Sequence, residues 1–172
     1  PNSLGKNLMF SPPQSLQKIH LVNAFNCDKA SLNDWLKRYS LQAQQSGSAK
    51  TFVVCDAQKV AAYFSLTLGQ IDTFDAPDRV RQGMGQYPIP VIILARLAVD
   101  RQYKGLGLGT GLLKEAIKKA LIIAEHAGVR ALITHPLDEE AKTFYLRFGF
   151  VPSPTSQGLL VLLLKDAKRV VT

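Results

Sequence analysis

The segment PVIILARLAVDRQYKGLGLGTG, residues 90–111, combines an apolar run with a glycine-rich turn. The run between Pro90 and Asp100 is rich in Val, Ile and Leu, which is typical of a strand buried on both faces. Glycine then occupies every second position from Gly105 to Gly111, and an amphipathic helix follows without a break. Glycines let the backbone approach a ligand closely, and a helix N-terminus favours negative charge. The segment therefore predicts a central strand, a phosphate-binding loop and a helix.

Two common nucleotide-binding motifs are excluded by counting residues in this loop. A dinucleotide-binding motif needs glycines at offsets zero, two and five, but Thr110 or Leu112 occupies the last of these positions. A Walker loop needs Gly-Lys followed by Ser or Thr, and the loop has no such sequence. The loop is therefore predicted to bind a phosphate group, but neither of these motifs identifies the ligand as a nucleotide.

Length and composition indicate one globular domain over residues 1–172. The chain is 47% hydrophobic and 20% charged, so it can bury a core of its own. The opening residues PNSLGKNL lack the pattern of a cleaved signal, and we interpret 1–10 as a tail or added residues before a start near Met9. Lysine and arginine outnumber the acidic residues by 21 to 13, and the formal charge of +8 favours an anionic partner such as nucleic acid. Basic proteins that bind no polyanion are the alternative.

The cysteines and the longest apolar runs indicate the compartment. Cys27 and Cys55 lack metal-ligand spacing, so we expect a reducing environment, no metal site and two buried apolar side chains. No run approaches the roughly twenty apolar residues of a membrane span. We therefore predict a cytoplasmic protein that does not associate with a membrane.

The periodicity along the chain predicts an α/β layered domain with a central mixed sheet of about six to seven strands and about four helices. Strands are expected at 16–21, 51–56, 60–68, 91–99, 129–134, 150–151 and 158–165. One helix is expected from Ser31, as its N-cap, to about Gln44, and another from the glycines to Gly128. A third begins after Asp138 and ends at Gly149, and residues 71–90 are expected to form a loop with one helical turn near Asp78.

Residues 102–107, Gln-Tyr-Lys-Gly-Leu-Gly, resemble the Gln/Arg-x-x-Gly-x-Gly/Ala pyrophosphate loop of the GNAT superfamily of N-acetyltransferases. The order of the motifs also matches this family, including Phe-Tyr-x-x-Phe-Gly-Phe at 144–150. Two further motifs are similar to the toxin branch of the family, which acetylates aminoacyl-tRNA. They are Phe25-x-Cys27 followed by Leu32-Asn33-x-Trp35-Leu36, and Arg-Leu-Ala-Val-Asp at 96–100. The branch often has glycine where this chain has Ala95.

The resemblance implies that acetyl coenzyme A (acetyl-CoA) is the acetyl donor. In the family, backbone N–H groups of the loop hold the pyrophosphate, which transfers to Lys104, Gly105, Leu106, Gly107, Leu108, Gly109 and Thr110. The pantetheine arm pairs with the central strand, which implicates Leu97, Ala98 and Val99. An N–H group there would stabilise the oxyanion that forms as the thioester carbonyl becomes tetrahedral.

Tyr145 matches the general acid of the family. Full proton transfer from a phenol of pKa about 10 to a thiolate of pKa about 8.5 is uphill by about 2 kcal/mol, so Tyr145 is expected mainly to hydrogen-bond the sulfur. The alternative is that Tyr145 only packs, as Phe144 and Phe148 do.

The sequence offers no clear general base among His20, His126 and His135; only His135, at a strand end, lies near a plausible site. An α-amine with a pKa of about 7.7–8.0 is partly neutral at cytoplasmic pH, whereas about one lysine amine in a thousand is neutral. The missing base therefore favours an α-amine acceptor such as aminoacyl-tRNA.

The resemblance also implies partners: charged tRNA, a ribbon-helix-helix antitoxin and a second copy of the chain in a homodimer. Arg79 and Arg81 are the leading candidates for phosphate contacts, and the others are Lys29, Arg38 and Arg96. A solvated basic surface is the alternative for each of them. Two other functions stay open: acetylation of a protein or a small-molecule amine such as a polyamine, and a binding module that kept the fold without the activity.

Overall fold

The structure is a computed structural model that describes residues 9–172 in two compact units. Among the described residues, unit 1 comprises 9–65 and Arg96–Leu112, and unit 2 comprises Leu66–Ala95 and Leu113–Thr172. The tail predicted at 1–10 lies almost entirely outside the described residues. The single-domain organisation therefore stays a prediction, and each unit is described by itself below.

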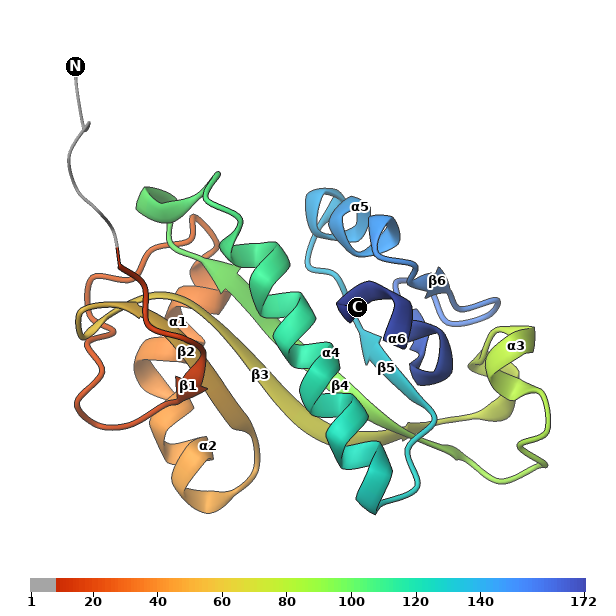
Figure 1. Ribbon diagram of the computed structural model, residues 1–172. Coiled ribbons are helices and arrows are strands. Elements are labelled where there is room, and N and C mark those ends of the chain that lie inside the picture. The colour runs from red at the N-terminus through yellow and green to blue at the C-terminus, as the bar shows by residue number, and fades with distance from the viewer. Residues whose placement is uncertain (1–8) are drawn as a thin grey trace. The chain divides into compact units, whose positions relative to one another are not determined.

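The strands confirm the predicted mixed sheet and its number of strands. Within residues 9–172, seven strands are hydrogen-bonded in the order β1-β2-β3-β4-β5-β7-β6. The strands β4 and β5 pair in parallel, and β1–β2, β5–β7 and β6–β7 are antiparallel. Figure 1 labels the strands, which are β1 (Gln14–Ser15), β2 (Lys50–Asp56), β3 (Lys59–Ile71), β4 (Ile89–Val99), β5 (Ala131–Thr134), β6 (Val151–Pro152) and β7 (Leu160–Leu163).

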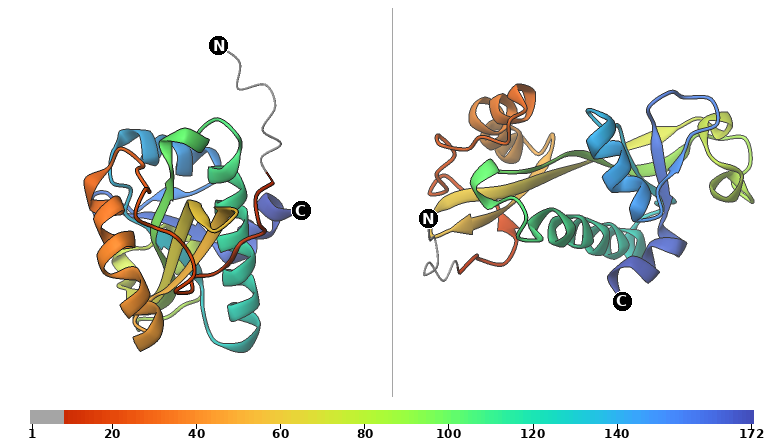
Figure 2. Two further views of the ribbon diagram at one scale, coloured as in Figure 1. Left: turned by 90° about the vertical axis from the view of Figure 1, so that its left-hand side faces the viewer. Right: turned by 90° about the horizontal axis from the view of Figure 1, so that it is seen from above.

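Unit 1 packs α1 (Ala30–Arg38) and α2 (Ser40–Ser46) against its strands, as the views in Figure 2 show. Its core contains Phe25, Leu36, Val53 and Tyr63, which are at most 1% exposed. The buried cysteines, Cys27 and Cys55, belong to the same core, as predicted.

Three predictions for unit 1 are wrong. The strand expected at 16–21 is absent, because the Gln17 N–H donates to His20 Nδ1 (2.9 Å) and closes a turn there. The single helix expected from Ser31 is two helices, because Tyr39 leaves the helical region at φ −121°. The N-cap position of α1 is Lys29 rather than Ser31.

Unit 2 contains α3 (Asp78–Arg81), α5 (Glu139–Arg147) and α6 (Leu164–Val171), and its core includes the strand residues Val91, Ile133 and Val161 together with Val80 of α3. The helical turn predicted near Asp78 is confirmed as α3, and a 3-10 turn, η1 (Thr73–Asp75), precedes it. The strand predicted at 158–165 is wrong at its end, because the chain enters α6 at Leu164. Leu164 and Ala167, three positions apart, are the buried residues of α6, which is a helical period.

The number of helices also differs from the prediction. Residues 9–172 contain six α-helices instead of about four, because the first predicted helix is split and because α6 is added. The long helix after the glycines, α4 (Leu108–His126), is as predicted: Leu113, Ala116, Ile117 and Ala120 are buried, whereas Lys114 is exposed.

The N-terminus of α5 gives a test of local stability. The Asp138 carboxylate accepts a hydrogen bond from the Ala141 N–H (2.9 Å), as its predicted capping role requires. We expect Asp138→Ala to lower the free energy of unfolding by about 1 kcal/mol in a urea titration. Thr143→Ala, on the exposed side of the same helix, is the matched control. Equal stability of the two variants would contradict the capping role.

Candidate active site

The C-terminal half of β4 has an edge that β5 does not cover. The register between the two strands joins Val91, Ile92 and Ile93 to Ala131, Leu132 and Ile133. Leu97, Ala98 and Val99 lie farther along β4, beyond the last of these pairs. The backbone of 97–99 can therefore accept an extended ligand as an added strand on that edge.

The glycine-rich segment divides into a loop and the start of a helix. Gly105 and Gly107 have φ angles of +79° and +82°, and a Cβ atom built on either would meet no other atom within 4 Å. Gly109 and Gly111 lie instead in the first turn of α4, and the Gly111 N–H donates to the Gly107 carbonyl (3.0 Å). The prediction of a loop with all the glycines is thus corrected to a loop with Gly105 and Gly107.

This arrangement suits a phosphate group. The first N–H groups of a helix have no acceptor within the helix, and here they follow directly on the open loop. The N-terminal end of the helix dipole adds a partial positive charge. Residues 104–110 can therefore bind a phosphate through their backbone, and the open space above Gly105 and Gly107 leaves room for it.

A short 3-10 turn, η2 (Arg101–Tyr103), joins β4 to this loop and is fixed at both ends. Asp100 is 2% exposed and accepts the Gln102 N–H at its carboxylate (2.9 Å). Tyr103 is also buried, and its hydroxyl donates to Asp56 Oδ2 (2.7 Å). Burial, together with that carboxylate, raises the pKa of Tyr103 to about 12. The loop therefore begins at a rigid base.

Tyr145 lies in unit 2 on α5 and is 5% exposed. Its ring packs edge-on against Phe144 and Phe150, with centroids 5.3 Å away in each case. Burial raises the pKa of Tyr145 to about 12, and a side-chain hydrogen bond with Thr134 acts in the opposite direction. Tyr145 therefore keeps its proton at any physiological pH and can act only as a hydrogen-bond donor or a very weak acid.

Thr134 is a polar neighbour of this hydroxyl. The Thr134 hydroxyl donates to the Leu94 carbonyl (3.0 Å), and the Thr134 side chain also has a hydrogen bond with Tyr145. Leu94 follows the last β4 residue that pairs with β5. Sequence reasoning did not find Thr134, because a threonine at the end of a strand carries no signal of its own.

The arginines proposed to contact RNA make contacts within the protein. Arg79 forms a two-pronged ion pair with Asp166 (2.6 and 2.7 Å), which ties α3 to α6, and Arg81 pairs with Asp78. The Arg96 guanidinium stacks on the Trp35 ring at 3.8 Å, and burial lowers its pKa. Arg38 lies in the last turn of α1, and Lys29 precedes that helix.

Two histidines remain as candidates for a base on the surface. His20 is buried, its Nδ1 accepts the Gln17 N–H, and burial lowers its pKa. His126 ends α4, whereas His135 is exposed just after β5. Among the described residues of unit 2, none is positioned to activate His135 as a base.

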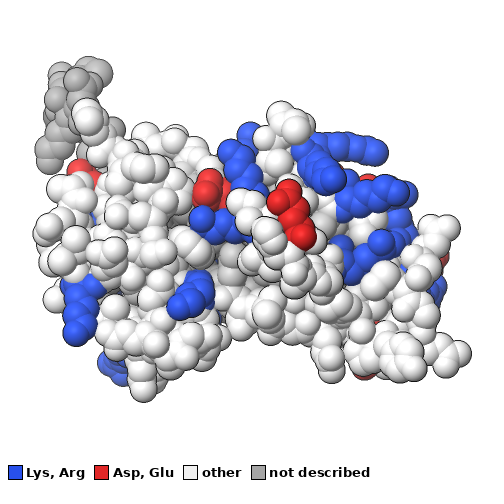
Figure 3. Space-filling model, turned by 60° about the horizontal axis from the view of Figure 1, so that its bottom comes forward, with Lys and Arg blue, Asp and Glu red and all other residues white. Residues whose placement is uncertain are grey.

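The charges on the surface favour an anionic partner. Lys and Arg side chains cover more of the face drawn in Figure 3 than Asp and Glu do, as the formal charge of +8 leads one to expect. Residues 9–172 contain no group of three metal-ligating side chains. Within the same range, no helix is both long and apolar enough to cross a membrane.

The structure thus divides the predicted site between the two units. Unit 1 contains residues 97–99 and 104–110, which carry the predicted donor-binding backbone, together with Arg96, Arg38 and Lys29. Unit 2 contains Tyr145, Thr134, Arg79 and Arg81. Each unit is consistent by itself with its predicted part of an acyl-transfer site.

Comparison with known proteins agrees with this geometry. Residues 47–152 match the acetyltransferase (GNAT) domain family. The chain is also 39% identical over 162 residues to a protein of Mycobacterium tuberculosis named tRNA-acetylating toxin, and the match covers 94% of this chain and 97% of that protein. This chain therefore belongs to the GNAT acetyltransferase family.

Solved structures share the fold. AtaT complexed with acetyl-methionyl-tRNA has a TM-score of 0.86 and 23% identity, covering 95% of this chain and 100% of that chain. A mutant AtaT toxin bound to the C-terminus of the antitoxin AtaR and to acetyl-CoA has a TM-score of 0.80 and 21% identity, covering 94% and 97%. At these low identities, the structural likeness shows a shared fold and nothing more specific.

The raised pKa of Tyr145 predicts a pH dependence of stability. Below pH 10 the folded and unfolded states both hold the phenolic proton, so the contribution of Tyr145 to the free energy of unfolding does not change with pH. Between pH 10 and about 12 only the folded state keeps it, so the free energy of unfolding falls as the pH rises, by up to about 3 kcal/mol.

We expect Tyr145→Phe to lose this part of the alkaline decline, which urea titrations at a series of pH values would measure. Tyr39→Phe removes a hydroxyl from a side chain that is 56% exposed and is the matched control. If the stability difference between wild type and Tyr145→Phe does not change with pH, the buried hydroxyl is not what the structure shows.

Proposed function

We propose that this protein transfers the acetyl group of acetyl-CoA to the α-amino group of aminoacyl-tRNA and thereby acts as a toxin that blocks translation. The observation that carries the proposal is the 39% identity to a tRNA-acetylating toxin along nearly the full length of both chains. The glycine loop and Tyr145 supply the chemistry that such a transfer needs.

The residues of unit 1 fit the donor. The N–H groups of 104–110 bind the pyrophosphate in this proposal, because Gly105 and Gly107 leave the loop open above the start of α4. The edge of β4 at Leu97–Val99 (97–99) holds the pantetheine arm, since β5 pairs with β4 only as far as Ile93. Acetyl-CoA then supplies an acetyl thioester, and an N–H group of this edge stabilises the oxyanion.

Tyr145 acts as a hydrogen-bond donor to the departing sulfur in this proposal. With a pKa of about 12, full transfer of its proton to a thiolate of pKa about 8.5 is uphill by about 5 kcal/mol. The net proton therefore comes from the attacking amine, and Tyr145 stabilises the charge without being consumed. The contact with Thr134 fixes the position of the phenol oxygen, and in this proposal the single phenolic proton is directed at the sulfur once the donor is bound.

The acceptor is inferred from its own chemistry. An α-amine is already partly neutral near pH 7, so it needs no strong base from the protein. The formal charge of +8 favours an RNA acceptor over a cationic polyamine, because like charges repel. Arg79, Arg81, Arg96, Lys29 and Arg38 remain the proposed phosphate contacts.

The partners and the location follow from the same resemblance. AtaT is bound to the C-terminus of an antitoxin in one of the structures that share this fold. We propose that this chain likewise has an antitoxin partner, of the ribbon-helix-helix class, that it forms a homodimer and that it acts in the cytoplasm.

The proposal is tested by incubating the protein with labelled acetyl-CoA and total charged tRNA. We expect label on the aminoacyl group, and a kcat for Tyr145→Phe that is lower by roughly a hundredfold or more. Tyr39→Phe, which also loses one hydroxyl, should keep wild-type activity. Label that moves to protein or to a small amine, with charged tRNA unlabelled, would overturn the proposed acceptor and leave an N-acetyltransferase of another specificity.

The glycine loop gives a second test. At Gly107, φ is +82°, so Gly107→Ala costs about 1–2 kcal/mol or moves the loop, and the KM for acetyl-CoA should rise by roughly tenfold. Gly111→Ala is the matched control, since Gly111 lies in α4 at a negative-φ helical position with open space around it. That variant should keep the wild-type KM and gain up to about 1 kcal/mol in stability. A larger effect of Gly111→Ala than of Gly107→Ala would contradict the assignment of the loop.

A further inference from the structure

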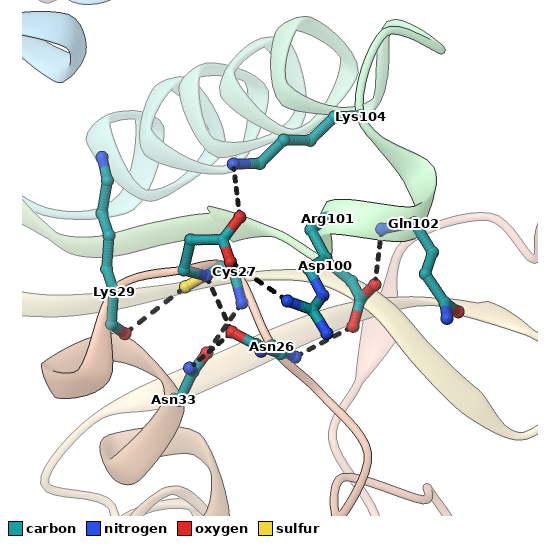
Figure 4. A network of polar contacts seen from close by, with 9 residues as sticks. Asn26, Cys27, Lys29, Asn33, Asp100, Arg101, Gln102 and Lys104 are labelled. Carbon is teal, nitrogen blue, oxygen red and sulfur yellow. Dashed lines mark hydrogen bonds and ion pairs between the residues drawn. The ribbon is translucent and has the colours of Figure 1, made fainter.

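A network of polar contacts joins the segment before α1 to the end of β4, and the proposed chemistry does not use it (Figure 4). The Asn26 N–H donates to Asp100 Oδ2 (2.9 Å), and the Arg101 N–H donates to the Asn26 carbonyl (2.8 Å). These two bonds fix the backbone of Asn26 against the start of η2, although 74 residues separate Asn26 from Asp100.

Asn33 of α1 fixes the same segment from the other side. Its Oδ1 accepts the Cys27 N–H (2.8 Å), and its Nδ2 donates to Asn26 Oδ1 (3.1 Å). Asn26 Oδ1 also accepts the Asp28 N–H (2.9 Å), which supports Asp28 at its unusual φ of +66°. Phe25 and Cys27, on either side of Asn26, are at most 2% exposed and anchor the segment in the core.

Asp100 is the group that most needs this network. A carboxylate that is 2% exposed has lost most of its water, and an unpaired one would cost several kcal/mol. The N–H groups of Asn26 and Gln102 satisfy one oxygen each. Since Gln102 lies in η2, the position of Asn26 determines where Asp100 can hold the base of the glycine loop.

Charge contributes less than these hydrogen bonds. Asp28 lies 3.6 Å from both Arg101 and Lys104, but all three side chains are about half exposed. Surface ion pairs of this kind contribute about 0–1 kcal/mol. The hydrogen bonds of Asn26 therefore dominate the positioning.

We propose that Asn26 and Asn33 are positioning residues for the donor-binding loop: they hold Asp100 and η2 so that the N–H groups of 104–110 face one point before acetyl-CoA binds. This inference rests on the proposed function for the identity of the ligand. It gives a physical role to the Phe25-x-Cys27 and Leu32-Asn33 motif, which lies in a different part of the sequence from the loop.

The test uses the full-length protein and acetyl-CoA, with the dissociation constant measured by calorimetry and with KM and kcat measured on charged tRNA. Asn26→Ala removes the acceptor for Asp28 and Asn33, so we expect it to raise the dissociation constant and the KM for acetyl-CoA by roughly fivefold to tenfold. The kcat at saturating acetyl-CoA should stay within about twofold of wild type, because Tyr145 and the thioester are not moved.

Three companion variants make the result specific. Asn26→Asp keeps an oxygen acceptor at the same place and should restore affinity to within about twofold of wild type. Asn33→Ala should resemble Asn26→Ala and serves in its place if Asn26→Ala does not fold. Asn23→Ala, at an exposed asparagine of the same loop, is the matched control and should bind as the wild type does.

Some outcomes would overturn the proposal. If Asn26→Ala and Asn33→Ala lower the melting temperature but leave the dissociation constant unchanged, the network has a structural role only. If Asn26→Asp binds as weakly as Asn26→Ala, the acceptor role is wrong.

The outcomes also separate this proposal from the proposed function. If wild type binds acetyl-CoA but does not acetylate charged tRNA, the proposed acceptor is wrong and the dissociation constants still decide the role of Asn26. If wild type does not bind acetyl-CoA, both proposals fail.

Discussion

The burial of the Asp100 carboxylate is the constraint on which the rest of unit 1 depends. A charge without water must have hydrogen-bond donors, and here the backbone N–H groups of Asn26 and Gln102 supply them. One donor comes from the segment before α1 and the other from η2, so a single carboxylate joins the N-terminal part of the chain to the glycine loop. The hydrogen bonds that hold the start of the loop are those of Asp100 and Tyr103 in the turn before it.

Unit 2 meets a different requirement. The Tyr145 hydroxyl must keep its proton and a fixed position. Burial keeps Tyr145 protonated, and Thr134, itself bonded to the Leu94 carbonyl, fixes the position of its oxygen. The same burial makes Tyr145 a poor proton source, which favours a role in which it stabilises charge. In both units, therefore, the polar groups of the proposed reaction are arranged by hydrogen bonds to backbone atoms or to short side chains. In the proposed reaction, backbone N–H groups and a phenol supply the electrostatic stabilisation.

The identity to a tRNA-acetylating toxin and the charge of the chain point to the same acceptor. Two of the arginines proposed to contact RNA also have partners within the protein. Arg79 is engaged by Asp166, and Arg96 lies on Trp35, so each has a structural role in addition to any contact with RNA. Residues of this kind can present a guanidinium group in one fixed orientation, whereas a free lysine cannot.

The sequence by itself determined most of the order of strands and helices, the family and the position of the glycine loop, because each depends on residues that are close together in the chain. An apolar run identified β4, apolar periodicity identified α4, and the spacing of Gly105 and Gly107 identified the loop. It did not determine that the first helix breaks at Tyr39, that the chain turns into α6 at Leu164 or that Gly109 and Gly111 belong to α4. Those boundaries depend on how side chains are buried by elements distant in sequence. Only the tertiary structure brought Asn26 to Asp100 and Thr134 to Tyr145, since a hydrogen bond between residues far apart in the chain leaves no local pattern.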